Sequence, residues 1–222
     1  MPRRRGSSVT MSDSEKVAYD INIAYKKPEE AAVRNAAYPE YLPTWHPISF
    51  PPLPPFEFTD PALRVTDTTL PNLLGRIGVG KLQDMQPGLG TVVTGVQLSE
   101  LSEKGKDELA WLVARRKIVA LPNQDLIDAG PEAQENFMKH FGKLNYQPVS
   151  GTVKDHHAFH VIHRDGNKDE IDVFFAKKST SCLWHQDVSF ERQPPGYVML
   201  GLLEGPEVGG DSVFAAADIA YK

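Results

Sequence analysis

Cysteine is almost absent from this chain, whose 222 residues include only Cys182. A single thiol cannot form a disulfide within the chain, and such scarcity is typical of proteins from a reducing compartment. We therefore expect a cytoplasmic protein. Cys182 stands three residues before His185, which leaves two interpretations open. It is either a thiolate ligand to a metal or, as we favour, a buried or pocket-lining residue.

Long apolar runs and a positive net charge are also missing. No segment approaches the roughly 20 apolar residues of a membrane-spanning helix, and the formal net charge is −5. Composition therefore indicates neither a membrane protein nor general affinity for nucleic acid. Residues 1–8 are basic and polar and lack the apolar core of a signal peptide. We expect residues 1–37 to form a disordered arm.

With 41% hydrophobic and 24% charged residues, the chain is long enough for one soluble domain with a sizeable core. Proline is concentrated in residues 38–72, and proline resists both helices and central strands. We predict an extended leader there whose interleaved aromatic side chains pack on a domain formed by residues 73–222. The alternative is a proline-rich ligand for an SH3-like partner.

Local patterns within residues 73–222 predict a mixed α/β domain. Alternation and turn residues predict short strands at residues 77–80, 91–96 and 118–121, the last of them buried. Ser102 is the expected N-cap of a helix that ends near Arg116. A second helix is expected to begin at residues 130–131, a Gly-Pro pair, and to end at Gly142. His140 lies on this helix, and we predict a structural role for it.

Four histidines cluster between residues 156 and 163. Their spacing is irregular and no cysteine accompanies them, so we favour exposed side chains or side chains that support a site over metal ligands. A metal-dependent lyase or isomerase of the cupin type, which would use this cluster, remains an alternative. The members of the cluster are His156, His157, His160 and His163.

The most informative segment is His185-Gln186-Asp187. In an extended segment, residues two apart point to the same side, so this imidazole and this carboxylate can reach one metal from the end of a single strand. One further imidazole would complete the two-histidine, one-carboxylate set that holds non-haem Fe(II) and leaves positions open for substrate-side ligands and dioxygen. By itself, a His-x-Asp triplet is also compatible with an exposed histidine beside a solvated aspartate.

The surroundings of this triplet resemble the taurine and 2,4-D dioxygenase family, and most closely its fungal sulfonate dioxygenase branch. The resemblance extends over roughly residues 38–222. It is carried by Trp184-His185-x-Asp187-Val188, Gln193-Pro194-Pro195-Gly196 and Pro206-Glu207-x-Gly209-Gly210-Asp211-Ser212. Upstream, Phe141-Gly142-Lys143-Leu144 and Val161-Ile162-His163-Arg164-Asp165 fit the same pattern.

This resemblance implies a double-stranded β-helix (a jelly roll of the clavaminate-synthase-like type). It also implies an enzyme that uses Fe(II) and 2-oxoglutarate to hydroxylate a small, anionic, sulfonate-like substrate with dioxygen, forming succinate and carbon dioxide. His185 and Asp187 would bind the iron, and the Ser212 hydroxyl would bind the far carboxylate of 2-oxoglutarate. No nucleic acid or membrane partner is implied, and a homo-oligomer is left open.

The resemblance also indicates the substrate side of the site. The family's sulfonate-contacting histidine corresponds to Gln147, an aromatic hydroxyl to Ser150, and a polar amide to a position near Cys182. Gln147 can donate a hydrogen bond but carries no positive charge. The substrate side of this sequence therefore departs from that of the taurine enzyme.

The family's distal iron-binding histidine and cosubstrate-binding arginine have no counterpart, since no histidine follows Asp187 and no arginine follows Arg192. We therefore expect a jelly roll that is incomplete at its C-terminus, as in a fragment. We expect this chain by itself to bind Fe(II) weakly and to be inactive, although the resemblance implies an enzyme. The alternative function is that of a truncated, non-catalytic remnant of the family.

Overall fold

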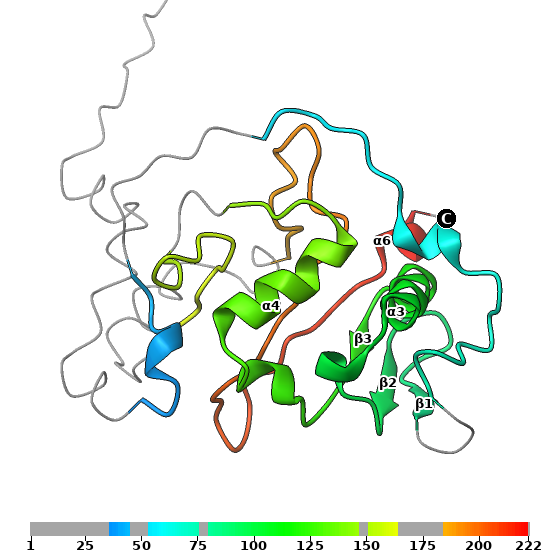
Figure 1. Ribbon diagram of the computed structural model, residues 1–222, viewed down its shortest axis with the longest axis horizontal. Helices are drawn as coiled ribbons and strands as arrows, with labels where there is room; N and C mark the ends of the chain where they lie inside the picture. The colour runs from blue at the N-terminus through cyan, green and yellow to red at the C-terminus, as the bar shows by residue number, and fades with distance from the viewer. Residues whose placement is uncertain (1–35, 45–52, 76–79, 147–150, 164–183, 222) are drawn as a thin grey trace, which may run out of the picture. The chain divides into compact units, whose positions relative to one another are not determined.

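The computed structural model describes residues 36–44, 53–75, 80–146, 151–163 and 184–221 (Figure 1). The chain divides into two compact units. The first comprises Met1–Phe50 and Tyr146–Asp187, and the second comprises Pro51–Asn145 and Val188–Lys222. The predicted iron ligands His185 and Asp187 belong to the first unit, whereas Ser212 belongs to the second.

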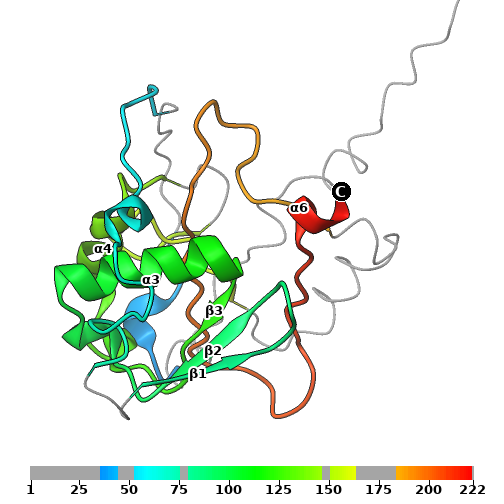
Figure 2. The same ribbon diagram turned by 90° about the vertical axis from the view of Figure 1, so that its right-hand side faces the viewer.

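The second unit contains a three-stranded sheet in the order β1-β2-β3. β1 (Lys81–Asp84) pairs antiparallel with β2 (Thr91–Thr94), and β2 pairs parallel with β3 (Val119–Ala120). The parallel pair is connected by the helix α3 (Glu103–Arg116), which lies beside the sheet (Figure 2), as parallel strands require a crossover. The strand predicted at residues 91–96 is confirmed for residues 91–94.

Two other strand predictions have different outcomes. Most of the segment 77–80 lies outside the described residues. The strand predicted at residues 118–121 is present only as the two residues of β3, which are half-buried rather than buried. Pairing with β2 alone leaves β3 at an edge of this sheet, which explains its exposure. The described residues form this three-stranded sheet and do not form a double-stranded β-helix, which stays a prediction.

Both predicted helices are confirmed, together with the residues that begin and end them. The Ser102 hydroxyl accepts a hydrogen bond from the Gly105 amide over 3.1 Å at the start of α3, which satisfies one of the unpaired donors of a helix N-terminus. The helix α4 (Pro131–Met138) follows Gly130, whose φ is 87°. It continues as the 3-10 turn η6 (Lys139–Phe141), which ends at Gly142 with a φ of 147°.

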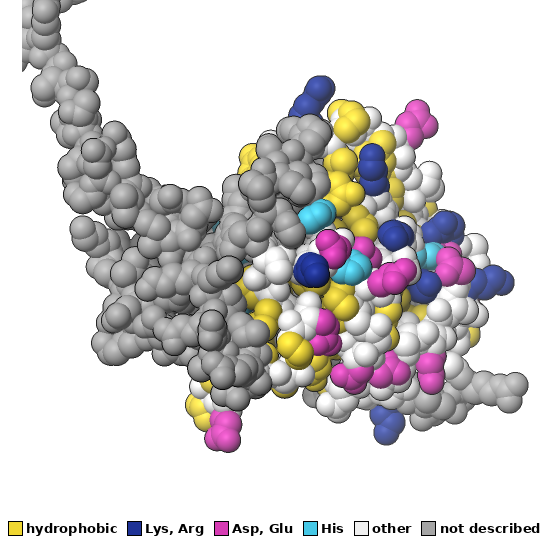
Figure 3. All heavy atoms as spheres, turned by 60° about the vertical axis from the view of Figure 1, so that its left-hand side comes forward, with side chains coloured by type: hydrophobic (Ala, Val, Ile, Leu, Met, Phe, Trp, Pro, Cys, Tyr) yellow, Lys and Arg dark blue, Asp and Glu magenta, His cyan; other side chains and the backbone are white. Residues whose placement is uncertain are grey.

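The core of the second unit lies between α3, α4 and the sheet. Its largest fully buried side chains include Leu70, Leu73 and Val93. The other members of this buried hydrophobic cluster are Ala62, Leu98, Leu109, Ala110, Leu112, Leu126, Phe137 and Phe141. On the face shown in Figure 3, hydrophobic side chains also reach the surface between acidic and basic ones.

Short helical segments complete the described structure. The first unit has η2 (Pro39–Tyr41). The second unit has η3 (Pro61–Arg64), η4 (Leu98–Glu100), η5 (Asp125–Ile127) and the short helix α6 (Ala217–Ala220). No helix in the described ranges is long and apolar enough to cross a membrane.

Part of the proline-rich leader is attached to the second unit by reciprocal hydrogen bonds. The Phe56 amide donates to Oε1 of Gln193 over 2.9 Å, and Nε2 of Gln193 donates to the Phe56 carbonyl over 3.1 Å. A glutamine amide thus pairs with the backbone as a neighbouring strand would. Gln193 begins the Gln-Pro-Pro-Gly segment, so one function of that segment in this chain is to hold the leader.

Candidate functional site

His185 and Asp187 approach each other closely in the first unit. Nε2 of His185 lies 2.9 Å from Oδ1 of Asp187, and the two side chains are 71% and 61% exposed. Residues 184–186 have no regular secondary structure, and Asp187 begins a turn. The expectation that one strand presents both side chains is therefore wrong, although the two side chains do meet.

The distance between these two atoms fits a shared metal ion. Two ligands at about 2.1 Å from a metal and at right angles to each other lie about 3 Å apart. The 2.9 Å between Nε2 and Oδ1 matches that separation. Without a metal, an N–H of His185 can donate to the carboxylate, and a metal would replace that hydrogen. The residues therefore fit one edge of an iron coordination sphere, and their exposure leaves its other positions open.

His160 lies close enough to Asp187 for their charges to interact. Partial burial lowers the pKa of His160, and the negative charge of Asp187 opposes this shift. Sequence patterns do not indicate this interaction, because the two positions are 27 residues apart. His160 is therefore a neighbour of the candidate metal pair that sequence patterns alone would not reveal.

The other histidines of the cluster have structural surroundings. His156, His157 and His163 are half-buried rather than exposed. The His156 ring lies edge-on to Phe159, with centroids 6.3 Å apart, and Nδ1 of His157 is 3.4 Å from Oγ1 of Thr152. Across the described ranges, no three His, Cys, Asp or Glu side chains converge as a metal site would require. The cupin-like alternative therefore receives no support from this cluster.

His140 has the structural role predicted for it. Its Nδ1 lies 2.8 Å from Oε2 of Glu103, and its Nε2 lies 2.7 Å from Oδ1 of Asp107. Arg64 pairs with the same Asp107 oxygen at 2.8 Å. The ring is therefore fixed between η6, α3 and η3, and both of its nitrogens are engaged.

Ser212 is exposed in the second unit and follows a turn built on two glycines. Gly209 and Gly210 have φ values of 84° and 76°, a region that favours glycine. A Cβ at Gly210 would also lie 3.1 Å from Cγ of Pro206. The sequence Pro-Glu-Val-Gly-Gly thus turns the chain sharply, and it leads into the segment in which the Ser212 hydroxyl is accessible to a ligand.

The three candidate substrate residues are close to one another in the sequence only in part, since Cys182 follows Gln147 and Ser150 by more than 30 positions. Gln147, Ser150 and Cys182 lie outside the described residues. Their roles stay predictions, as do the domain boundaries at residues 37 and 72.

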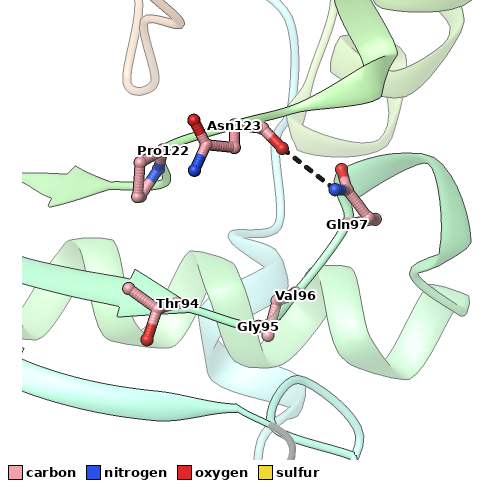
Figure 4. A pocket seen from close by; sticks show the side chains of 6 residues that line it. All are labelled: Thr94, Gly95, Val96, Gln97, Pro122 and Asn123. Carbon is pink, nitrogen blue, oxygen red and sulfur yellow. Dashed lines mark hydrogen bonds between the residues drawn. The ribbon is translucent and has the colours of Figure 1, made fainter.

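A separate crevice of about 360 Å³ lies in the second unit (Figure 4). The loops that follow β2 and β3 form it, and a hydrogen bond of 2.9 Å from Nε2 of Gln97 to the Asn123 carbonyl connects them. Its lining consists of Thr94, Gly95, Val96, Gln97, Pro122 and Asn123. None of these side chains titrates near neutral pH or prefers iron, so the crevice lacks the groups for acid–base or iron chemistry.

Residues 81–222 match the family model described as "Taurine catabolism dioxygenase TauD, TfdA family". This match includes His185, Asp187 and Ser212.

Three relatives from fungi are similar over most of this chain. The "Alpha-ketoglutarate-dependent sulfonate dioxygenase" of Saccharomyces cerevisiae is 41% identical over 80% of this chain and 44% of its own length. The "Alpha-ketoglutarate-dependent dioxygenase cnsP" of Penicillium expansum is 36% identical over 83% of this chain and 50% of its own. A "Putative alpha-ketoglutarate-dependent sulfonate dioxygenase" of Schizosaccharomyces pombe is 32% identical, with 86% and 48% covered. The chain therefore spans about half the length of the curated relatives it matches.

Proposed function

The chain belongs to the taurine catabolism dioxygenase TauD, TfdA family, and from this premise we propose that it supplies the iron- and 2-oxoglutarate-binding residues of a dioxygenase. The activity we propose is the hydroxylation of a small, anionic, sulfonate-like molecule, with dioxygen consumed and with succinate and carbon dioxide formed from 2-oxoglutarate. The observation that carries the proposal is the 2.9 Å approach of His185 Nε2 to Asp187 Oδ1.

His185 and Asp187 would hold Fe(II) through Nε2 and a carboxylate oxygen. When bound, Fe(II) and 2-oxoglutarate together supply the activation of dioxygen that oxidises the substrate carbon. A neutral imidazole and one carboxylate leave the metal with a residual positive charge, which favours an anionic cosubstrate. In the described ranges no third residue completes the ligand set, so these two residues are the part of the iron site that we assign.

Ser212 would bind the cosubstrate carboxylate that lies away from the metal. A hydroxyl donates one hydrogen bond, and a bond to a charged acceptor is stronger than one between neutral groups. The exposure of Ser212 after the Gly209–Gly210 turn supports this role, because a ligand can reach its side chain. Its position in the Gly-Gly-Asp-Ser segment, where the family has Gly-Gly-Asp-Thr, supports it as well.

A sulfur oxyanion is the substrate class that we propose. Two of the three relatives above are named as sulfonate dioxygenases, and a Pseudomonas putida relative, 26% identical over 60% of this chain, is named "Alpha-ketoglutarate-dependent sulfate ester dioxygenase". Sulfonates and sulfate esters share an anionic sulfur–oxygen group. We propose Gln147, Ser150 and Cys182 as the residues that line the substrate side, and a jelly roll in a cytoplasmic protein as their setting.

The proposal is tested with the chain held without oxygen. Fe(II) and 2-oxoglutarate are added together, and the visible metal-to-ligand charge-transfer band is recorded and compared with Fe(II) alone. The proposal predicts a band that requires both Fe(II) and 2-oxoglutarate and that is absent in His185→Ala. It also predicts that Fe(II) dissociates more slowly from the native chain when 2-oxoglutarate is present. Equal spectra with and without 2-oxoglutarate, at millimolar concentrations of each, would refute the proposal for this chain.

A further inference from the structure

Lys117 occupies a backbone position that favours glycine. It follows the last residue of α3 with a φ of 69° and a ψ of −35°, and side chains are disfavoured at positive φ. Glycine adopts a positive φ most readily, because it has no Cβ. A non-glycine residue in such a conformation is often held there by contacts of its side chain.

The Lys117 ammonium connects two segments that are far apart in the sequence. Nζ lies 3.3 Å from the Gly88 carbonyl oxygen, in the loop between β1 and β2, and 3.4 Å from Oδ2 of Asp218 in α6. The Lys117 side chain is 31% exposed, so water only partly screens these contacts. The ammonium thus joins α6 to the β1–β2 loop.

The loop that receives α6 is itself held in place. Arg116 donates to the carbonyl oxygens of Gln86 and Gly90, over 2.7 and 2.8 Å. The side chain of Ile219 in α6 packs directly against Gly88, since a Cβ at Gly88 would lie 2.8 Å from its Cδ1 atom. Arg116 therefore fixes the surface on which α6 rests, and Lys117 fixes α6 to that surface.

Ser212 lies in the segment that leads to α6. Residues 211–221 run from the Gly209–Gly210 turn to α6, and Ser212 has no regular secondary structure around it. Among the contacts that the structure describes for this segment, those of Asp218 and Ile219 join it to the rest of the second unit. The contacts of Asp218 and Ile219 therefore attach the C-terminal part of this segment, and the Gly209–Gly210 turn lies before Ser212.

We propose that Lys117 is a positioning residue for Ser212. Its ammonium joins Asp218 to the Gly88 carbonyl and so limits the motion of residues 211–221. The Ser212 hydroxyl is thereby kept in the position in which it would bind the 2-oxoglutarate carboxylate. The predicted effect of Lys117 on 2-oxoglutarate binding rests on the function proposed above. The attachment of α6 by Lys117 does not depend on that function. Loss of a partly exposed ion pair of this kind corresponds to about a threefold to fivefold change in an equilibrium constant.

The decisive variant is Lys117→Gly. Glycine relieves the positive φ while it removes the ammonium, so the thermal midpoint should stay the same or rise. If Lys117 only stabilises the fold, Lys117→Gly should therefore lose neither stability nor 2-oxoglutarate affinity. Lys117→Arg keeps the charge and should behave as the native chain, Asp218→Asn removes the other partner, and Lys104→Ala is the matched control. Lys104 is an exposed lysine of α3, the helix that Lys117 follows, so the loss of charge is equal.

Two measurements are made on the full chain with each variant. The first is hydrogen–deuterium exchange of residues 211–221 by mass spectrometry without ligand, which includes the α6 amides of Ile219, Ala220 and Tyr221 that donate to Ala216 and Ala217. The second is the dissociation constant of 2-oxoglutarate in the presence of Fe(II) without oxygen. We expect exchange about threefold to fivefold faster, and 2-oxoglutarate affinity weaker by a similar factor, in Lys117→Gly and Asp218→Asn only.

The outcomes separate this proposal from the function on which it rests. Unchanged exchange in both variants, or equal acceleration in Lys104→Ala, would overturn the attachment of α6 by Lys117. Faster exchange with unchanged 2-oxoglutarate affinity would overturn the positioning of Ser212. If the native chain does not bind 2-oxoglutarate at all, the proposed function fails, and the exchange measurement still decides whether Lys117 holds the segment.

Discussion

The phenol of Tyr197 donates a hydrogen bond of 2.6 Å to Oδ1 of Asp60, across 137 residues of sequence. The same carboxylate oxygen accepts a hydrogen bond from the Ala62 amide and so begins η3. The Tyr197 ring also packs against Phe141, with centroids 5.5 Å apart. One tyrosine therefore fixes the end of the leader to the helical core, and its ionisation would remove that attachment.

Stability at alkaline pH should depend on Tyr197. Burial raises the pKa of its phenol, and the hydrogen bond and charge of Asp60 raise it further. A pKa higher in the folded than in the unfolded state stabilises the fold fully below the unfolded value of about 10, and this contribution is lost as the pH rises above that value. Tyr197→Phe should lower the free energy of unfolding by about 1 kcal/mol at neutral pH and should flatten its alkaline decline. Urea unfolding from about pH 7 to about pH 11 measures both effects.

The matched control for this prediction is Tyr221→Phe, which removes the hydroxyl of a tyrosine that is 95% exposed. It should leave the stability and its pH dependence unchanged. An alkaline decline of equal steepness in the native chain and in Tyr197→Phe would contradict the role of the Tyr197–Asp60 pair.

Glu108 should be among the most costly acidic residues to replace. It is 4% exposed, and its carboxylate accepts hydrogen bonds from the amides of Asn72 and Leu73, over 2.7 and 2.6 Å, and from the Asn72 side chain over 2.5 Å. In Glu108→Gln, an NH₂ group replaces one of the two carboxylate oxygens. This group cannot accept a hydrogen bond, so at least one of the three N–H donors loses its acceptor. We expect a loss of about 3 kcal/mol of unfolding free energy, measured by urea unfolding. The exposed Glu100→Gln should change it by less than about 0.5 kcal/mol, and an equally small loss in Glu108→Gln would contradict the prediction.

The buried position of Glu108 is a feature of the fold that could not be predicted from the sequence. The bounds of α3 and α4 followed from local signals, since Ser102, Gly130 and Gly142 act on adjacent backbone. Glu108 looks like any helix-surface acid in the sequence. Its partners lie 35 and 36 positions earlier, and no local pattern identifies them.

The candidate site also has one feature that the sequence predicted and others that it did not. The spacing of His185 and Asp187 predicted that both side chains can reach one metal, and the structure places Nε2 of His185 2.9 Å from Oδ1 of Asp187. The conformation that brings them together was not predictable from that spacing. Asp187 is followed by Val188 at a φ of 55°, which a β-branched residue rarely adopts, so the sequence favoured a strand. The proximity of His160 to Asp187 depends on tertiary structure and had no local signal.

Replacement of either candidate metal ligand should abolish iron binding. His185→Ala or Asp187→Ala leaves one of the two assigned ligands, and changes even to residues behind metal ligands cost about 10-fold to 100-fold in affinity. We therefore expect at least about a 100-fold loss of Fe(II) affinity and no charge-transfer band with 2-oxoglutarate, measured by anaerobic titration. His157→Ala removes a clustered histidine outside the pair and serves as the control. A native-like band in Asp187→Ala would contradict the assignment.

Ser212 should affect 2-oxoglutarate specifically. Loss of a hydrogen bond to a charged group costs roughly 1.5–3 kcal/mol, so Ser212→Ala should raise the 2-oxoglutarate dissociation constant about tenfold to a hundredfold. Ser212→Thr keeps the hydroxyl and should stay within about threefold of the native value. Anaerobic titration at fixed Fe(II) gives both constants. Equal losses in the Ala and Thr variants would indicate a packing effect rather than the proposed hydrogen bond.

Self-association is expected through the segment that follows Gly196. Tyr197 and Met199 pack against the core, whereas Val198, Leu200 and Leu202 are 71%, 67% and 77% exposed. Alternate residues of an extended segment share one side, so these three form an apolar stripe that nothing covers in the described structure. Exposed apolar edges of this kind favour pairing with another chain, and we expect the apparent mass to rise with concentration in light scattering.

Replacement of the three side chains by threonine tests this association without disturbing the core. Threonine keeps the preference for extended backbone while it reduces the apolar surface, so Val198→Thr, Leu200→Thr and Leu202→Thr together should shift the chain toward monomer at equal concentration. The unfolding free energy should change by no more than about 0.5 kcal/mol at each exposed position. Leu63→Thr, at another exposed leucine of the second unit, should leave the association unchanged. A native chain that stays monomeric at all concentrations, or a triple variant that associates equally, would show that other surfaces control the behaviour of this chain.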